Sequence, residues 1–367
     1  MHVVASDQRR GAEIFAADLV RALREHGASQ RVAVLRSGWG GVDYGVPVKD
    51  LGATRALPGL RVDPKAMVLL GRAVLRPDVV QVHGGEALKY AAWATLGART
   101  PIVYRRIGSA PGWITGGLRR RLYGALMRRP ARIVAVAEAV RRETIALFGV
   151  APGRVITIPN GVDPLRMRPS KDRTQVRREL GVPQGAPILL SVAALTWEKD
   201  PLTHLAVSSM VMDEVPGAMH LLAGDGPMRG EVEGEIRRRG LSGHVRALGA
   251  RNDIADLMHA SDVLLFASRG DGMEGMPAIV IEAGMAALVV VGYDVAGVAE
   301  IVDDGRTGFL TAWGDVEGLA TRVSKLLSDD RLRRSMGELA RKRSARLDVR
   351  ALAPRYTEVY REVLGGR

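Results

Sequence analysis

Two glutamates, Glu274 and Glu282, stand in a segment whose residue types could bind both a sugar and a phosphate. The segment follows the apolar run 262–268 and continues as a glycine-rich turn, Gly-Met-Glu-Gly-Met-Pro, before a helical pattern that carries Glu282. Such a turn presents backbone N–H groups, and a helix N-terminus adds the positive end of its dipole, so both suit phosphate oxygens. The two carboxylates can hold hydroxyls of two different rings. The segment therefore predicts a nucleotide-sugar site at the carboxyl end of a parallel strand.

Short apolar runs alternate with helical patterns along both halves of the chain. In residues 11–26, for example, Ile14, Leu19 and Leu23 share one helical face. We expect strands at 2–5, 31–35, 78–82, 101–104, 132–136 and 154–158, and again at 187–192, 219–223, 245–248, 262–267, 288–291 and 308–311. This alternation predicts the α/β class, with two Rossmann-like, doubly wound parallel sheets.

A chain of 367 residues suits two domains. We place a first Rossmann-like domain at 1–162 and a nucleotide-sugar-binding domain at 187–349. The polar, proline-bearing segment 163–186 is expected to be a linker. The last helix, within 350–367, comes after the expected strands of the second sheet, and we expect it to pack back on the first domain.

The composition excludes several kinds of chemistry. With no cysteine, the chain cannot form a disulfide, a thiolate metal site or a cysteine nucleophile. No Asp-x-Asp motif occurs, so no metal-diphosphate bridge is marked, and we expect neither a bound metal nor a cofactor. No leader pattern or spanning apolar run is visible, which leads us to expect a cytoplasmic protein.

The net positive charge of the chain comes from its first half. Residues 1–162 hold 25 Lys and Arg against 11 Asp and Glu, a net charge of +14, whereas residues 163–367 hold 28 against 29, a net charge of −1. A nucleic acid, an anionic membrane, an anionic substrate or an arginine-rich coding bias would each explain this. Aromatic residues are only 4% of the chain and no motif that reads nucleic acid is found, so we expect no nucleic-acid partner.

Residues 112–132 interleave leucines with arginines, including Arg119, Arg120 and Arg121. A basic amphipathic helix of this kind can lie on anionic lipid. The alternative is a helix whose apolar side packs on the first sheet while its arginines face water. The sequence leaves both open.

Five motifs, one of which contains Glu274 and Glu282, follow one another along the chain. They are Ile-Pro-Asn-Gly-Val-Asp at 158–163, Ala-Gly-Asp-Gly-Pro at 223–227, the paired-glutamate block at 274–283, Gly-Val-Ala-Glu-Ile-Val at 297–302 and Asp-Gly-Arg-Thr-Gly at 304–308. Together they resemble the retaining glycosyltransferases of the GT-B fold, family 4. The resemblance implies two domains that face each other across a cleft, with residues 1–162 as the acceptor-side domain. It also implies metal-independent transfer from a nucleoside-diphosphate sugar to an acceptor hydroxyl. The acceptor could be a lipid-linked or cell-envelope glycoconjugate or a soluble small molecule, and a non-catalytic partner subunit is the remaining alternative.

The resemblance also implies roles for single residues in the second domain. Glu274 would contact the donor sugar and act in catalysis, Glu282 the ribose, and Lys199 the diphosphate, while Ala194 stands where the family has an arginine. The other donor-binding residues would be Gly11, Gly224, Arg246, Gly275, Met276 and Pro277.

The first domain departs further from the family pattern. Ile107 stands where many relatives have a sugar-contacting histidine. His83, at the end of an expected strand, is the candidate to replace it as a catalytic residue. Arg105 and Arg106 are the candidates for contact with an anionic acceptor.

Overall fold

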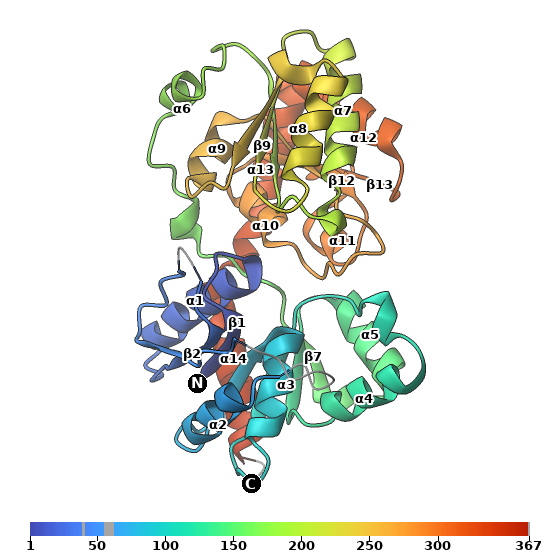
Figure 1. The fold of residues 1–367 in the computed structure, drawn as a ribbon. Helices are drawn as coiled ribbons and strands as arrows, with labels where there is room; N and C mark the ends of the chain where they lie inside the picture. Colours follow the sequence, from blue (N-terminus) through green and yellow to red (C-terminus); the bar gives the residue numbers. More distant parts are fainter. Residues whose placement is uncertain (39–40, 55–61, 366–367) are drawn as a thin grey trace. The chain divides into compact units, whose positions relative to one another are not determined.

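The computed structural model of the protein describes residues 1–38, 41–54 and 62–365. The chain divides into two compact units, Met1–Val162 with Leu347–Arg367, and Asp163–Arg346. Each unit contains a parallel sheet with helices packed on it (Figure 1). The expected class, two Rossmann-like doubly wound sheets, is therefore confirmed.

The first unit is built on a seven-stranded sheet in the order β3-β2-β1-β4-β5-β6-β7. All of its pairings are parallel. Its strands are β1 (His2–Ser6), β2 (Val32–Arg36), β3 (Val48–Asp50), β4 (Val80–His83), β5 (Ile102–Arg106), β6 (Arg132–Ala135) and β7 (Val155–Thr157). Its helices are α1 (Gly11–Glu25), α2 (Pro64–Ala73), α3 (Gly84–Ala94), α4 (Gly117–Met127), α5 (Glu138–Phe148) and α14 (Val349–Gly365).

The second unit has a six-stranded parallel sheet in the order β10-β9-β8-β11-β12-β13. Its strands are β8 (Ile188–Val192), β9 (Met219–Ala223), β10 (Val245–Gly249), β11 (Val263–Phe266), β12 (Val289–Tyr293) and β13 (Gly308–Thr311). Its helices are α6 (Arg173–Glu179), α7 (Pro201–Glu214), α8 (Arg229–Arg238), α9 (Ile254–Ala260), α10 (Ala278–Met285), α11 (Val298–Ile301), α12 (Val316–Ser328) and α13 (Asp330–Ser344). In both sheets the first strand is central, and later strands are added first on one side of it and then on the other. Where the strand order reverses in this way, a ligand site opens at the carboxyl edge of the sheet.

The segment 163–186 is not a linker. It contains the 3₁₀ helix η3 (Pro164–Met167) and helix α6, and it belongs to the second unit. Arg173 and Arg177 of this segment donate to the two carboxylate oxygens of Asp262 at 2.7 and 3.0 Å, which fixes α6 beside the start of β11. The sequence pattern was misleading because these arginines find their partner more than eighty residues away.

The last helix, α14, completes the core of the first unit. Its buried residues, including Leu352 and Tyr356, pack with Phe15 and Leu19 of α1 and with apolar residues of the sheet. The hydroxyl of Tyr360 donates to Gln81 of β4 at 3.0 Å. The core of this unit is therefore built from residues at both ends of the chain.

Candidate functional site

Four loops of the second unit meet at the carboxyl edge of its sheet. They follow β8, β9, β11 and β12, which are neighbours in the parallel sheet. Backbone hydrogen bonds join the first two loops, because the N–H of Ala193 donates to Ala223 and the N–H of Leu195 donates to Asp225, both at 3.0 Å. The loop after β11 is tied to the loop after β8, since the N–H of Arg269 donates to Glu198 at 3.0 Å.

Glycines allow these loops to approach one another. A Cβ on Gly224 would lie 1.7 Å from the carbonyl oxygen of Ala193, and a Cβ on Gly297 would lie 1.7 Å from that of Gly275. Both positions also have φ in the region that favours glycine, +150° and +77°. Gly297, from the Gly-Val-Ala-Glu motif, therefore supports the turn that carries Glu274 and Met276.

The structure brings Lys199 and Glu274 into direct contact. Lys199 ends the 3₁₀ helix η4 (Trp197–Lys199) after β8, and its ammonium group donates to Glu274 Oε1. Both side chains are largely buried. The ammonium group that the sequence assigned to the diphosphate and the carboxylate that it assigned to the donor sugar thus lie side by side, 75 residues apart in the sequence.

Helix α10 begins next to this pair and has no side-chain cap. Its N-cap residue is Pro277, which has no hydrogen-bonding side chain. Gly275, Met276 and Pro277 are buried in the turn before it. The N-terminal N–H groups and the positive end of the helix dipole are consequently directed at the edge where the Lys199–Glu274 pair lies.

Glu282 lies on α10 and is paired with Arg166. The Nη2 atom of Arg166, in η3, donates to Glu282 Oε1 at 3.0 Å, and the glutamate is buried. Sequence reasoning missed Arg166. An arginine three residues after Asp163 of the Asn-Gly-Val-Asp motif was the available signal, but its partner could not be read from the sequence.

Ala194 stands where the family has an arginine. Among the described residues, no other arginine or lysine of these four loops offers an unpaired charge in its place. Arg229 donates to Asp225 at 3.1 Å and to Glu233 at 2.9 Å. Arg269 is held by Asp271 at 2.9 and 3.0 Å. Lys199 is therefore the cation best placed beside the α10 N-terminus.

A chain of buried histidines and serines supports the loop that carries Lys199. Ser208 contacts His220 Nδ1 at 2.6 Å, His220 Nε2 contacts Ser191 at 2.8 Å, and Ser191 contacts His204 Nδ1 at 2.7 Å. Burial lowers the pKa of His220 to about 3. Burial also lowers the pKa of His204 to about 4, although Asp200 and a hydrogen bond to the Lys199 backbone oppose this shift. Both imidazoles are neutral at physiological pH.

The candidate residues of the first unit are mostly buried, which corrects three expectations. Arg105 is only 1% exposed, donates to Asn160 at 2.6 Å and stacks on Phe15 with its Cζ 3.6 Å from the ring centre. Arg106 is buried and pairs with Glu143. Neither guanidinium group is available to an acceptor in this structure.

His83 is likewise enclosed instead of facing the carboxyl edge. Its Nε2 lies 3.0 Å from His2 Nδ1, and Phe15 covers it. Burial lowers its pKa well below the ordinary value, and the charges of His2 and Arg105 add to this shift. The side chain points into the layer under α1 and α14, so it does not contact a substrate here. Gly11 differs, because it opens α1 with nothing within 4 Å of where a Cβ would be, and no side chain caps that helix.

Arg246 is also not directed at the site. It is the second residue of β10, and its guanidinium group donates to the carbonyl oxygens of Leu180 and, at 2.9 Å, Gly181. It ties the edge strand to the end of α6. Base contacts, if they come from β10, would have to come from its last residues near Gly249.

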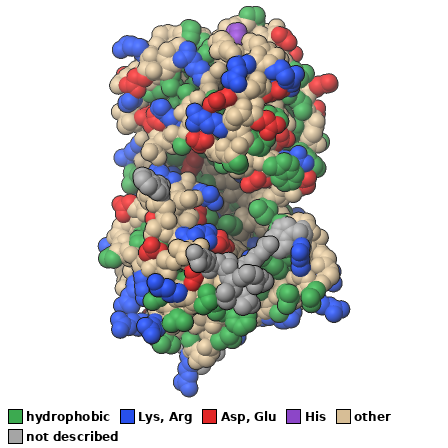
Figure 2. Space-filling model, viewed as in Figure 1, with side chains coloured by type: hydrophobic (Ala, Val, Ile, Leu, Met, Phe, Trp, Pro, Cys, Tyr) green, Lys and Arg blue, Asp and Glu red, His purple; other side chains and the backbone are tan. Residues whose placement is uncertain are grey.

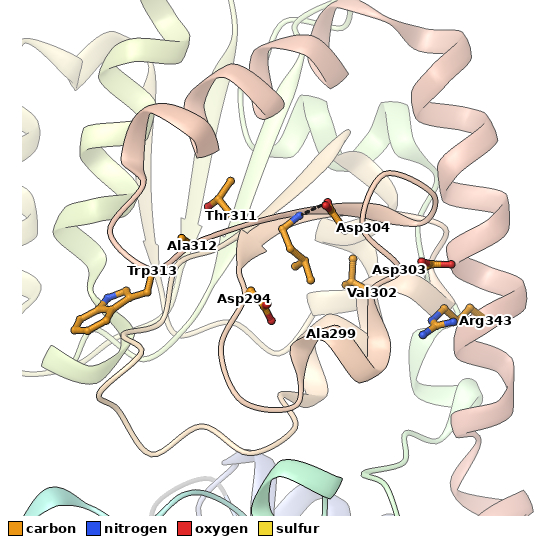
Figure 3. Close-up of a pocket in the computed structure, with 10 residues that line it drawn as sticks. Asp294, Ala299, Val302, Asp303, Asp304, Thr311, Ala312, Trp313 and Arg343 are labelled. Atoms are coloured by element: carbon orange, nitrogen blue, oxygen red, sulfur yellow. Dashed lines mark hydrogen bonds between the residues drawn. The ribbon is translucent and has the colours of Figure 1, made fainter.

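A cavity of about 590 Å³ lies beside these loops (Figure 3). Trp313 lies at one end, Asp303 and Arg343 at the other, and the N–H of Leu310 donates to Asp304 at 2.8 Å. None of the residues that the sequence assigned to the donor site lines this cavity. The Asp-Gly-Arg-Thr-Gly motif therefore contributes to its wall, through Asp304, and not to the Lys199–Glu274 pair.

In the part of the chain that the structure describes, no group of three or more His, Cys, Asp or Glu side chains is arranged to hold a metal ion. None of the helices described combines the length and the apolar character that a membrane crossing requires.

Comparison with protein families matches both units. Residues 9–166 match the family described as Glycosyltransferase Family 4, and residues 172–343 match the one described as Glycosyl transferases group 1. Together these matches include all the motifs discussed above.

Curated relatives are similar over part of their length. The chain is 29% identical over 235 residues to N-acetyl-alpha-D-glucosaminyl L-malate synthase of Bacillus anthracis, an alignment that covers 63% of this chain and 60% of the relative. It is 30% identical over 258 residues to D-inositol 3-phosphate glycosyltransferase of Kineococcus radiotolerans, which covers 64% and 58%. The matched region thus spans about three fifths of each relative.

Solved structures share the fold over nearly the whole chain. HepE of Anabaena in complex with UDP and glucose has a TM-score of 0.83 at 21% identity, covering 98% of this chain and 99% of that one. WaaG, a glycosyltransferase involved in lipopolysaccharide biosynthesis, has a TM-score of 0.78 at 18% identity, covering 98% and 99%. These likenesses establish the fold.

Proposed function

This chain belongs to the family 4, group 1 glycosyltransferases, and we propose that it transfers a sugar from a nucleoside-diphosphate sugar to an acceptor hydroxyl with retention of configuration. The observation that carries the proposal is the contact between Lys199 and Glu274 beside the uncapped start of α10. It supports a site in which a cation and a helix N-terminus would bind the phosphates and a carboxylate would bind the sugar, all at one sheet edge.

Each of these groups has a distinct task in the proposed reaction. Lys199 and the N-terminus of α10 bind the diphosphate and stabilise the negative charge that it gains as the bond to the anomeric carbon breaks. Glu274 holds the donor sugar, and its carboxylate stabilises positive charge that develops on the ring. Glu282, held by Arg166, binds the ribose hydroxyls. Retention requires the acceptor hydroxyl to approach the face that the diphosphate leaves.

The donor and the independence from metal can be tested together. We expect one of UDP-glucose, UDP-N-acetylglucosamine, GDP-mannose or ADP-glucose to raise the melting temperature, since a ligand at 100 times its Kd adds about 2.7 kcal/mol of stability. The same donor should release its nucleoside diphosphate slowly in water, with an excess of EDTA present. Loss of release in EDTA with recovery on adding magnesium would refute metal independence. No stabilisation by any donor would refute the proposed function.

We propose further that the acceptor is reached at an anionic membrane surface, through helix α4 of the first unit. Leu118 and Leu122, one turn apart on α4, are 70% and 60% exposed, so these two leucines do not pack against the rest of the unit, whereas Met127 of the same helix is buried. Arg119, Arg120 and Arg121 are exposed on the same helix. Figure 2 shows Lys and Arg side chains interspersed with hydrophobic ones over the surface of this unit. An exposed apolar turn flanked by arginines suits the interface of an anionic bilayer.

Vesicle sedimentation tests this surface. Wild-type protein should bind phosphatidylglycerol vesicles at low salt and less at high salt, because exposed charges are screened over ~8 Å at physiological ionic strength. Changing Leu118 and Leu122 to Gln, or the three arginines to Gln, should abolish most of this binding. Leu339→Gln, an exposed leucine of the second unit, is the matched control. Absence of binding to anionic vesicles at low salt would exclude the membrane-bound acceptor.

A soluble acceptor is the alternative in that case. The names of the two curated relatives contain L-malate and inositol 3-phosphate, which are small anionic molecules. The net charge of +14 on residues 1–162 would attract such an acceptor as well. Its contacts would come from exposed residues such as Arg9 and Arg10, because Arg105 and Arg106 are buried.

A further inference from the structure

Three loops of the second unit bring two tryptophans onto one arginine. The Cζ atom of Arg269 lies 4.2 Å from the ring centre of Trp197 and 5.4 Å from that of Trp313. Trp197 follows β8, Arg269 follows β11 and Trp313 follows β13. Trp313 is packed so closely on the backbone of Gly270 that a Cβ there would lie 2.8 Å from the indole. The cluster is thus held in a defined position at the carboxyl edge of the sheet.

Its aromatic rings remain widely accessible. Trp197 is 56% exposed and Trp313 is 45% exposed, and Met273, on the same loop as Arg269, is also more than half exposed. Large apolar side chains gathered on a surface mark an interaction site more often than single ones do. Trp313 also lines the cavity shown in Figure 3, so this indole borders a hollow as well as open solvent.

The charge on this cluster is balanced within it. Asp271 accepts from Nε and Nη2 of Arg269 at 2.9 and 3.0 Å. Asp271 raises the pKa of Arg269, so the guanidinium group stays charged. The pair uses two of the five guanidinium N–H groups, and each carboxylate oxygen keeps acceptor capacity. Such a pair offers donors and acceptors to hydroxyl groups, but little net attraction to an anion.

We propose that Trp197, Trp313 and the Arg269–Asp271 pair form a binding surface for a neutral sugar ring of the acceptor. The C–H face of a pyranose packs on an indole, while its hydroxyls bond to the arginine and the aspartate. The identification of this sugar as part of the acceptor rests on the proposed function. The binding of a sugar to the surface does not.

The surface is distinct from the donor-binding groups. Trp197 and Lys199 are two positions apart in η4, and with three residues per turn their side chains leave the helix in different directions. Lys199 is directed at Glu274, whereas Trp197 is directed at Arg269. A ring stacked on Trp197 would therefore lie beside the diphosphate site and not in it.

Binding of neutral hexasaccharides tests the proposal. Maltohexaose, cellohexaose and mannohexaose would be titrated while tryptophan fluorescence and saturation-transfer NMR are recorded, with hexagalacturonate as the anionic comparison. We expect at least one neutral sugar to bind more tightly than hexagalacturonate. Trp197→Ala and Trp313→Ala should each weaken it ten-fold or more, while the two Phe variants keep most of the affinity. Trp93→Ala, which removes a 50% exposed tryptophan of the first unit, should have no effect.

Several outcomes would overturn the inference. One is failure of all three neutral sugars to bind the wild type, and another is equal binding by the wild type and the alanine variants. A third is an equal loss of nucleoside-diphosphate affinity in those variants, because the indole would then stack on the base or support the loops. If sugars bind through the tryptophans but no donor stabilises the protein, the surface stands and the proposed function fails. If a donor stabilises the protein but no neutral sugar binds through the tryptophans, the proposed function stands and the proposed surface is refuted.

Discussion

Replacing Glu274 with glutamine is expected to lower the turnover number about 10²–10³-fold, while the fold and the affinity for nucleoside diphosphate survive. Glutamine keeps the shape of the side chain and can still form hydrogen bonds to hydroxyl groups, but it removes the charge that we propose stabilises the transition state. It also leaves Lys199 without the carboxylate that it contacts in the free protein. The turnover number for donor hydrolysis and the calorimetric Kd for the nucleoside diphosphate are the two quantities to measure.

Two variants separate this effect from general disturbance of the loops. Glu198→Gln changes a neighbouring carboxylate that is not paired with Lys199 in the structure, and its rate should stay close to that of the wild type. Lys199→Ala should weaken nucleoside diphosphate binding by roughly 1.5–3 kcal/mol, the contribution of a charge-assisted bond, and nucleoside binding much less. A wild-type rate in Glu274→Gln would exclude this glutamate from catalysis.

Mild acid is expected to destabilise both units well before their carboxylates are protonated. Burial lowers the pKa of His2 to about 3, that of His204 to about 4 and that of His220 to about 3, against 6.5 for an ordinary histidine. Below pH 6.5 the unfolded chain takes up protons that the folded chain does not, so stability falls as pH falls. At pH 5.0 each such histidine contributes a loss of about 2 kcal/mol, hence roughly 4 kcal/mol for His204 and His220 together. A domain has only about 5–15 kcal/mol in total.

Urea midpoints between pH 8.0 and 5.0 measure this loss. His220→Gln, which offers a neutral amide to Ser191 and Ser208, should be less stable at pH 8.0 but should lose less stability between pH 6.5 and 5.0. His259→Gln, at an exposed histidine, should follow the wild-type slope. Equal midpoints at pH 6.5 and 5.0 in the wild type would show that the buried histidines do not govern acid stability.

Local sequence patterns were sufficient to predict most of the fold. Twelve strands were expected and all twelve occur, since buried parallel strands read as short apolar runs between helical patterns. The exception is β3, Val48–Asp50, an exposed three-residue edge strand with no such pattern. The motifs likewise identified the loops that carry Lys199 and Glu274, because these loops follow the expected strands β8 and β11.

Interactions between distant segments could not be predicted in the same way. His83 ends β4 and Arg105 is the penultimate residue of β5, but their side chains turn toward α1 and α14, and α14 lies more than 240 residues further on. The pairing of Arg166 with Glu282 and the stacking of Trp197 and Trp313 on Arg269 also join residues from separate loops. The hydrophobic periodicity of the sequence does not reveal such contacts.

The position of α14 has a consequence for how the protein is made. The first 162 residues leave the ribosome before the second unit is translated, yet the surface of Phe15, Leu19 and Ile158 is covered only by residues after Leu347. At ~5–20 residues per second, that apolar surface stays open for roughly 10–40 seconds during synthesis. Of the two units, the one that begins to emerge first is thus the one that is completed last.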